Sequence, residues 1–382
     1  MTQQYPAGWR FGNLLPIKSL LLLLGLLLGG GAQAQSGPYG NEWLVAGQPY
    51  YKIKVWRDGI YRLDYAYLQN LNATGVAPTR FQVWRRGKEV AVYQAGNQAT
   101  LDATSYLEFY GQRNDGALDR DFYKKPGDQA HQYYSLYTDT AAYFITWGSR
   151  VGKRMAQPVA AGGTPHAWRI QTALKVATDK YFEAPAQGTV HMPWLNQGEG
   201  FYSNWSYQGE MPIVTDSLLR AIVTTPGAPP IRAEVCVAGK TIPGDKGGVT
   251  GLHTTGIRVM PPGASAARDL GVLTYMNYDF KKALYTLNAS DINPDGKVEI
   301  RGLMIGQRTA PIFDLYAFSY VKITAPQQSV WFTNRRSLWF QNDSLLSGPA
   351  TYELDNIPGT VVGYDVQDPY NVQRIAPTAS QT

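Results

Sequence analysis

The sequence predicts an all-β protein with two β domains, of which the second is a sandwich or jelly roll. Three features lead to this prediction. Short segments rich in β-branched and aromatic residues alternate with polar residues at a period of two. The chain contains 39 glycines and 24 prolines, which supply turns between such segments. Residues 106–147 hold an unusual density of Tyr, Phe and Trp around a group of Asp, Asn and Gly.

Residues 1–34 are typical of a secretory signal peptide. Arg10 and Lys18 supply positive charge, Leu20–Leu28 is an apolar run, and Ala32–Ala34 is a small-x-small cleavage site before Gln35. The apolar run is shorter than the roughly 20 residues of a transmembrane helix, which favours a cleaved leader over a retained membrane anchor. We therefore expect cleavage between Ala34 and Gln35, and export to the periplasm, the outer membrane surface or the extracellular space.

Residues 35–156 form the predicted N-terminal, aromatic-rich β domain. Alternation on both sides of Asp58-Gly59 predicts a hairpin, and the same logic applies around Arg86-Gly87. One short helix is expected at Tyr65–Leu71. The strands of this domain are predicted at Tyr51–Val55, Ile60–Leu63, Phe81–Trp84, Glu89–Tyr93, Tyr106–Tyr110 and Tyr143–Trp147.

The composition changes at residues 157–165 (QPVAAGGTP), which predicts a linker. A β-sandwich, jelly-roll-like domain is expected over 166–325, because short strands recur there at nearly even spacing. Its strands are predicted at Ser217–Thr224, Ile231–Val237, Ile257–Val259, Leu270–Tyr275, Ala283–Leu287, Val298–Ile300 and Phe313–Ile323. Residues 326–382 are predicted to be a connector with further strand-like pieces at Val330–Thr333, Ser337–Phe340 and Thr351–Leu354.

Charge and cysteine content exclude several classes of protein. The net charge of +6 falls to +4 once the two basic residues of the leader are removed, and the excess is scattered along the chain. This distribution argues against a nucleic-acid-binding protein. The single cysteine, Cys236, allows no intrachain disulfide.

The residues typical of catalytic and metal sites do not form a recognisable pattern. Cys236 lies inside an alternating strand with no nearby histidine, which favours a buried structural cysteine over a nucleophile. The four histidines show no zinc-ligand spacing, and the sequence contains no Gly-x-Ser-x-Gly motif. We therefore assign no catalytic residue, no metal ligand and no cofactor.

Two acidic segments are candidate calcium loops. The first runs from Asp291 to Gly296, but Gly302 occupies the position where a calcium loop requires a bidentate glutamate, so a β-turn is favoured. The second comprises Asn114-Asp115-Gly116 with Asp119 and Asp121, for which a solvated turn is favoured over a calcium site.

An aromatic segment bracketed by glycines is a candidate glycan-binding site. Aromatic rings beside a polar group suit stacking on a sugar, although such rings more often fill a core or a contact between domains. The candidate residues are Trp194, Glu199, Tyr202, Asn204 and Trp205.

Several blocks in order along the chain resemble the N-terminal, non-catalytic region of gingipain-like cysteine peptidases. The resemblance is to the type IX secretion system sortases of Bacteroidetes, the PorU-like proteins, and covers most of the mature chain. The matching blocks are residues 51–55 with 58–63, residues 108–111 with 114–116 and 118–119, residues 135–140 with 143–144, and residues 198–201, 320–323 and 364–366 with 368–369.

The resemblance implies a cell-surface peptidase that removes a sorting domain from cargo and attaches the cargo to a glycolipid. In that family the catalytic Cys and His lie in a caspase-like domain that would follow Thr382, so no catalytic residue is transferred to this chain. The expected partners are that peptidase domain, in cis or from a downstream frame, components of the type IX system, and cargo.

The sequence supports three hypotheses about the function of this chain. The first is an exported, non-catalytic piece that scaffolds or docks the peptidase domain, which predicts that the aromatic residues of 106–147 are buried or lie at a domain contact. The second is a free-standing cell-surface glycan-binding protein. The third, an independent hydrolase, requires a converging nucleophile and base that the sequence does not reveal. Whether the chain takes part in catalysis is left open.

Overall fold

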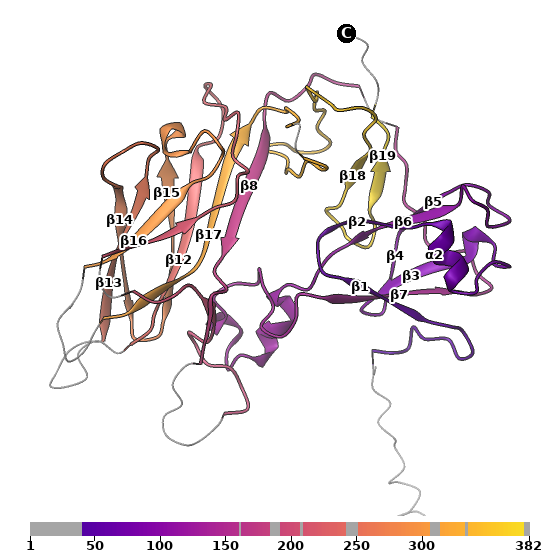
Figure 1. Ribbon diagram of the computed structural model, residues 1–382, viewed down its shortest axis with the longest axis horizontal. Helices are drawn as coiled ribbons and strands as arrows, with labels where there is room; N and C mark the ends of the chain where they lie inside the picture. The colour runs from indigo at the N-terminus through magenta and orange to yellow at the C-terminus, as the bar shows by residue number, and fades with distance from the viewer. Residues whose placement is uncertain are drawn as a thin grey trace, which may run out of the picture.

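The computed structural model describes residues 40–159, 162–183, 192–206, 209–241, 251–305, 314–332 and 335–377. The predicted signal peptide and its cleavage site lie outside these residues. The described chain is mostly β-strand, arranged in several antiparallel sheets with few helices, as the sequence predicts. Figure 1 shows the sheets in two groups, called here the first β region (strands β1 to β7) and the second β region (strands β8 to β17).

Two sheets make up the first β region and share one hydrophobic core. Ile53, Val55, Phe109, Tyr143 and Ile145 contribute buried side chains to this core from both sheets. One sheet has the order β1-β7-β3-β4, from β1 (Tyr51–Val55), β7 (Ala141–Trp147), β3 (Phe81–Arg85) and β4 (Lys88–Val90). The other has the order β2-β6-β5, from β2 (Gly59–Leu63), β6 (Tyr106–Gly111) and β5 (Val92–Ala95).

The hairpin predicted around Arg86-Gly87 is confirmed. Strands β3 and β4 pair with Arg85 opposite Lys88, so two residues make the turn. Both have positive φ angles, 48° for Arg86 and 74° for Gly87, as a type I′ turn requires.

The hairpin predicted around Asp58-Gly59 is wrong. Strand β1 pairs with β7, whereas β2 pairs with β6 in the other sheet. Local bonds direct the chain from one sheet to the other: the Asp58 carboxylate accepts a hydrogen bond from the Arg113 amide at 2.8 Å, and the Tyr61 hydroxyl donates to the Arg57 carbonyl at 3.0 Å. Both segments are strands, as the alternation predicts, but each pairs with a strand that is distant in the sequence.

The α-helix of the described residues, α2 (Tyr65–Asn70), agrees with the prediction. Asp64 is its N-cap and accepts a hydrogen bond from the Tyr67 amide at 2.9 Å. Leu68 is fully buried and anchors the helix on the first core.

Eight strands of the second β region form two four-stranded antiparallel sheets, while β9 and β10 pair with each other. Their buried residues, such as Ala233 and Val235 on one sheet and Ile257 and Val259 on the other, belong to a single core. One sheet has the order β11-β16-β13-β14, from β11 (Glu210–Val214), β16 (Glu299–Met304), β13 (Leu252–Met260) and β14 (Arg268–Met276). The other has the order β15-β12-β17-β8, from β15 (Phe280–Leu287), β12 (Ile231–Gly239), β17 (Tyr316–Gln327) and β8 (Arg169–Val176).

The run Ser217–Thr224 does not form the predicted strand, and its pairing is limited to an antiparallel bridge between Ile222 and Gln327 of β17. Leu219 is fully buried, yet its amide donates to the Gly296 carbonyl at 2.9 Å rather than to a neighbouring strand. Gly296 belongs to the turn predicted after Asp291, where the Gly296 amide donates to the Asn293 carbonyl at 2.7 Å.

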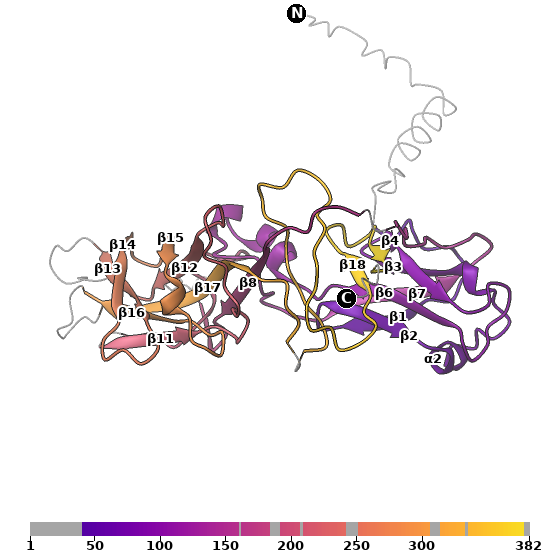
Figure 2. The same cartoon turned by 90° about the horizontal axis from the view of Figure 1, so that it is seen from above.

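Beyond β17 the chain returns to the first β region. The segments Ser337–Phe340 and Thr351–Leu354, predicted to be strand-like, form no strand. Strands β18 (Gly363–Asp365) and β19 (Gln373–Ile375) pair with each other beside the first β region (Figure 2). Nowhere in the described chain is there a helix of the length and apolarity that crossing a membrane demands.

Candidate functional site

Residues 112–140 lie between the two β regions (Figure 1), and part of this segment packs on strands β12 and β17 of the second. This contact is called the joint. Ala130 and Tyr133 pack against Cys236 and Tyr320, which point away from the core of the second region. The Tyr133 and His131 rings meet the Tyr320 ring edge-on, with centroids 5.0 and 5.6 Å away. The joint therefore buries aromatic surface from both regions.

The segment that forms the joint is held in shape by its own hydrogen bonds. The buried Asp119 carboxylate accepts from the Leu136 amide at 2.7 Å and from the Ser135 hydroxyl at 3.2 Å. The Gln129 side-chain amide donates to the Gly116 carbonyl at 2.7 Å. These bonds close the loop around its short helical turns η2 (Gly116–Phe122) and η3 (Pro126–Asp128).

The acidic group of this segment does not converge on a metal-binding point. Asp115 caps the turn η2 through the Ala117 amide, Asp119 faces the loop interior, and Asp121 lies beside Arg120 at the surface. Across the described parts of the chain, no three His, Cys, Asp or Glu side chains are grouped as metal ligands would be.

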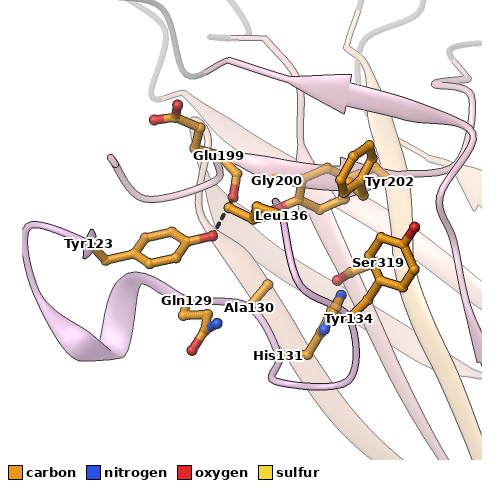
Figure 3. Close-up of a pocket in the computed structure, with 11 residues that line it drawn as sticks. Tyr123, Gln129, Ala130, His131, Tyr134, Leu136, Glu199, Gly200, Tyr202 and Ser319 are labelled. Atoms are coloured by element: carbon orange, nitrogen blue, oxygen red, sulfur yellow. Dashed lines mark hydrogen bonds between the residues drawn. The ribbon is translucent and has the colours of Figure 1, made fainter. Parts of the chain in front are cut away.

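A second set of contacts ties the joint to the strand pair β9 (Lys180–Phe182) and β10 (Gly200–Tyr202). The Tyr123 hydroxyl donates to the Glu199 carbonyl at 3.0 Å (Figure 3). The Lys124 amide donates to the Leu195 carbonyl at 2.8 Å, and the Leu195 amide donates to the Phe122 carbonyl at the same distance. These reciprocal bonds form a short bridge between the two regions.

Most aromatic residues of 106–147 are buried or half-buried, as the scaffold hypothesis requires. Phe109, Tyr110, Tyr123 and Tyr143 are buried within the first region or at the joint. Phe122 and Tyr137 are exposed and pack against each other, with ring centroids 5.4 Å apart; Tyr106, Tyr133, Tyr134, Phe144 and Trp147 are half-buried.

A second contact, called the clamp, holds residues 363–375 on the first β region. Val372 is fully buried against Ala91, Tyr110 and Met155. The Tyr364 hydroxyl donates to the Glu108 carboxylate at 2.7 Å, and the Arg62 guanidinium binds the other oxygen of that carboxylate at 2.7 Å. The Arg374 guanidinium lies over the Tyr93 ring at 4.0 Å.

His131 is the titratable group at the centre of the joint. Its Nδ1 accepts a hydrogen bond from the Tyr133 amide at 3.1 Å. Burial, with a smaller contribution from the positive charge of Lys282, lowers the pKa of His131 to about 4. The imidazole is therefore neutral at pH 7.

We expect the chain to lose stability as the pH falls from about 6.5 toward 4. In this window the unfolded chain, with an ordinary histidine pKa of about 6.5, binds a proton that the folded joint excludes. Urea midpoints measured at several pH values should fall more steeply for the native chain than for His131→Gln. The matched variant His166→Gln, outside the joint, should keep the native slope; an equal slope in all three chains would contradict this assignment.

Cys236 is a buried structural cysteine, as the sequence predicts. Its side chain is fully buried on β12 beneath the joint. Burial raises the pKa of the Cys236 thiol to about 12, outweighing the opposite effects of Lys282 and Ser319. The thiolate needed for nucleophilic attack is therefore not available at neutral pH.

The candidate glycan-binding residues do not present their rings on one open face. Tyr202 is only 1% exposed, with the Lys240 ammonium 3.1 Å from its ring centroid. Trp194 and Trp205 are partly exposed, and Lys124 and Lys180 lie over their rings; Asn204 is exposed beside them in sequence.

The Glu199 carboxylate forms hydrogen bonds with nearby residues of its own loop and of β9. It accepts from the Asn196 amide at 2.8 Å and from the Tyr181 hydroxyl at 3.1 Å. Both contacts stabilise the turn that leads into β10, next to the backbone carbonyl that binds Tyr123. Glu199 therefore helps to build the joint.

The sequence did not single out Gln129, His131 or Lys240 as important residues. Gln129 and Lys240 are buried and His131 is half-buried, and the Lys240 ammonium donates to the Gly198 carbonyl at 3.1 Å. Burial lowers the pKa of Lys240 to about 6. The one signal that pointed to this place was the aromatic density of residues 106–147.

Comparison with known proteins gives a match in structure but not in sequence. No family model and no curated protein matches the chain. Latent PorU from Porphyromonas gingivalis, whose crystal form is dimeric, superposes with a TM-score of 0.55 at 11% identity. The fold resembles part of PorU. The match covers 89% of this chain and 30% of that protein, so the chain spans less than a third of its length.

Other solved structures match only weakly. The Eiger TNF structure from S. frugiperda has 10% identity and a TM-score of 0.19, covering 45% of this chain and 100% of that one. A tandem CBM22 domain of Paenibacillus barcinonensis Xyn10C has 14% identity and a TM-score of 0.19, covering 74% and 75%. These scores are too low to support an inference about fold or function.

Proposed function

We propose that this chain is an exported, non-catalytic part of a type IX secretion system sortase of the gingipain-like class. Its second β region is a jelly roll, and its role is to scaffold and dock the peptidase domain at the cell surface. The observation that carries the proposal is the likeness of fold to part of PorU over 89% of the chain. The sequence blocks that resemble the PorU-like proteins support it independently.

The strand orders support the jelly-roll assignment. When β8 and β11 to β17 are numbered in chain order, the sheets read 1-8-3-6 and 2-7-4-5. In this order every strand pair is antiparallel and the chain passes repeatedly from one sheet to the other, as in a double-sheet jelly roll.

The joint and the clamp support a scaffolding role. Each fastens parts of the chain that are distant in sequence, through buried aromatic contacts at the joint and a buried valine with a bound carboxylate at the clamp. A framework of this kind keeps two β regions in a fixed relation, which a docked domain needs if its position is to be defined.

Binding to a peptidase domain tests the proposed function. The mature chain from Gln35 would be titrated into a separately produced peptidase domain of a PorU-like sortase, with calorimetry as the readout. We expect a Kd of about 10 μM or tighter, as for transient interfaces between domains. A folded chain that shows no heat of binding at several times this concentration would contradict the proposal.

Export predicts a defined N-terminus. The chain expressed with its own leader in a Bacteroidetes host should be recovered outside the cytoplasm and should begin at Gln35. Mass spectrometry of the recovered protein measures this directly. Ala34→Arg should block cleavage, because the cleavage site needs a small residue there, whereas recovery of an uncleaved native chain would indicate a retained anchor.

A further inference from the structure

His253, the second residue of β13, lies in the interior of the second β region, and both of its ring nitrogens contact oxygen atoms. Nδ1 contacts the carboxylate of Asp314, and the side chains of the pair are 0% and 1% exposed. Nε2 lies 3.0 Å from the Thr241 carbonyl oxygen and 2.6 Å from the Asn277 carbonyl oxygen. Four segments therefore meet at this ring: the start of β13, the residues before β17, the residues after β12 and the turn after β14.

These partners fix the number of protons that the pair holds. A backbone carbonyl can only accept a hydrogen bond, so Nε2 must carry a hydrogen. A neutral imidazole has a single N–H, so Nδ1 would then set its lone pair against the lone pairs of the carboxylate. A second proton between Nδ1 and Asp314 removes this repulsion. It also leaves the buried pair without net charge, as a site shielded from solvent requires.

The surroundings hold the ring in this orientation. The Tyr275 ring stacks on it, with centroids 5.0 Å apart and 17° between the planes. Gly239 stands on the side of β12, where a Cβ atom would come within 2.4 Å of Nε2. The Asn277 amide donates to the Gly251 carbonyl at 2.8 Å, which fastens the turn after β14 beside the start of β13. The other Asp314 oxygen, Oδ2, is shielded from solvent and has no partner among the described residues, so the ring is what compensates this carboxylate.

We propose that the His253–Asp314 pair is a proton-dependent latch, which holds a second proton at neutral pH and ties the residues before β17 to the start of β13. Loss of that proton at alkaline pH sets two lone pairs against each other and releases Asp314 from the ring. Both ring nitrogens are engaged in these contacts, so the imidazole does not act as a general base. The latch belongs to the second β region alone and does not depend on the binding of a peptidase domain.

Nuclear magnetic resonance of the mature chain labelled with 15N-histidine counts the ring protons directly. At pH 7.5 a free histidine is mostly neutral and has one ring N–H. We expect two ring N–H groups on His253. His131 is the internal comparison and should have no more than one, because its Nδ1 accepts from the Tyr133 amide and carries no proton. A single ring proton on His253 at this pH would overturn the proposal.

The variant Asp314→Asn distinguishes the latch from ordinary packing. The amide keeps the size of the carboxylate, and its nitrogen can donate to Nδ1 of a neutral imidazole. The variant should therefore fold and show one ring N–H on His253. As the pH rises above 7, the unfolding equilibrium constant of the native chain should increase relative to that of the variant by about tenfold per pH unit, until the latch opens. This is the effect of one proton that the folded chain binds and the unfolded chain releases.

Lys240, Asp279 and Tyr275 are the other titratable groups beside the latch among the described residues. Burial lowers the pKa of Lys240 to about 6, so this residue makes the folded chain more stable as the pH rises above 6. Burial raises the pKa of Tyr275 well above its usual range, so its hydroxyl stays neutral. Both effects are present in the native chain and in Asp314→Asn, and the difference between the two chains therefore reports the latch.

Asp279→Asn is the matched control. The Asp279 carboxylate lies near enough to interact with the charge of His253, but it is not one of the hydrogen-bond partners of the ring. This variant should keep the pH dependence of the native chain. Equal pH dependence in the native chain and Asp314→Asn, or the same change in both variants, would show that the second proton does not belong to the His253–Asp314 contact and would overturn the proposal.

Discussion

Replacing Tyr320 by alanine should destabilise the chain by about 3–5 kcal/mol, the usual cost of removing a large buried aromatic side chain. Tyr320 is nearly fully buried between the second region and the joint. Its ring contacts Tyr133 and His131, and its hydroxyl donates to the Glu234 carboxylate. The substitution removes the joint's main contact and leaves Glu234 without that donor.

Urea unfolding followed by tyrosine and tryptophan fluorescence would measure this loss. Because the joint couples the two regions, we expect the Tyr320→Ala chain to unfold in two separated steps. Tyr137→Ala is the control, since Tyr137 belongs to the same segment but is 64% exposed. That variant should change stability by no more than about 0.5 kcal/mol. Equal losses for both variants would show that the ring contacts at Tyr320 do not hold the joint.

Val372→Asp should release the clamp. Val372 is 0% exposed among apolar neighbours, so the new carboxylate would be buried without a partner at a cost of at least about 3 kcal/mol. Detachment of residues 363–375 avoids this cost. The segment should then become accessible to protease while the rest of the chain stays folded.

Limited proteolysis with mass spectrometry reads out this release. New cleavage is expected between residues 357 and 377 in Val372→Asp but not in Val362→Asp, because Val362 immediately precedes the clamp segment and is 39% exposed. The same cleavage pattern in both variants, or in neither, would show that Val372 does not anchor the clamp.

Local chemistry explains what the sequence predicted correctly. The turn at Arg86-Gly87, the capped helix that follows Asp64 and the burial of Cys236 depend on neighbouring residues or on simple alternation. The all-β class was also predictable, because β-branched and aromatic residues dominate the short segments.

Strand β8 shows why alternation fails in other places. Arg169 and Gln171, which look like surface residues, are buried, while Ile170 and Thr172 between them are only half-buried. The Arg169 guanidinium donates to the side-chain oxygens of Gln171 at 2.8 Å and Gln327 at 2.9 Å. Gln327 belongs to β17, which is distant in the sequence. Hydropathy alone would therefore place Ile170 in the core and Arg169 and Gln171 in solvent, which is the reverse of what the structure shows.

The joint was only partly predictable for the same reason. The aromatic density of residues 106–147 indicated that this segment packs against something. Which surface it meets depends on Cys236 and Tyr320, whose outward positions on β12 and β17 become clear only when the sheets are assembled. The role of Gln129, which donates to the Gly116 carbonyl inside the segment, follows from that assembly and has no signature in the sequence.

The clamp also affects the order in which contacts form during folding. The bond between Tyr364 and Glu108 joins residues 256 positions apart. Contacts so distant along the chain form slowly, because a long loop must close before they are made. The first β region, although translated first, therefore lacks this contact until residues 363–375 have been synthesised. Until then, the side chains that Val372 covers in the folded chain, Ala91, Tyr110 and Met155, stay open to solvent.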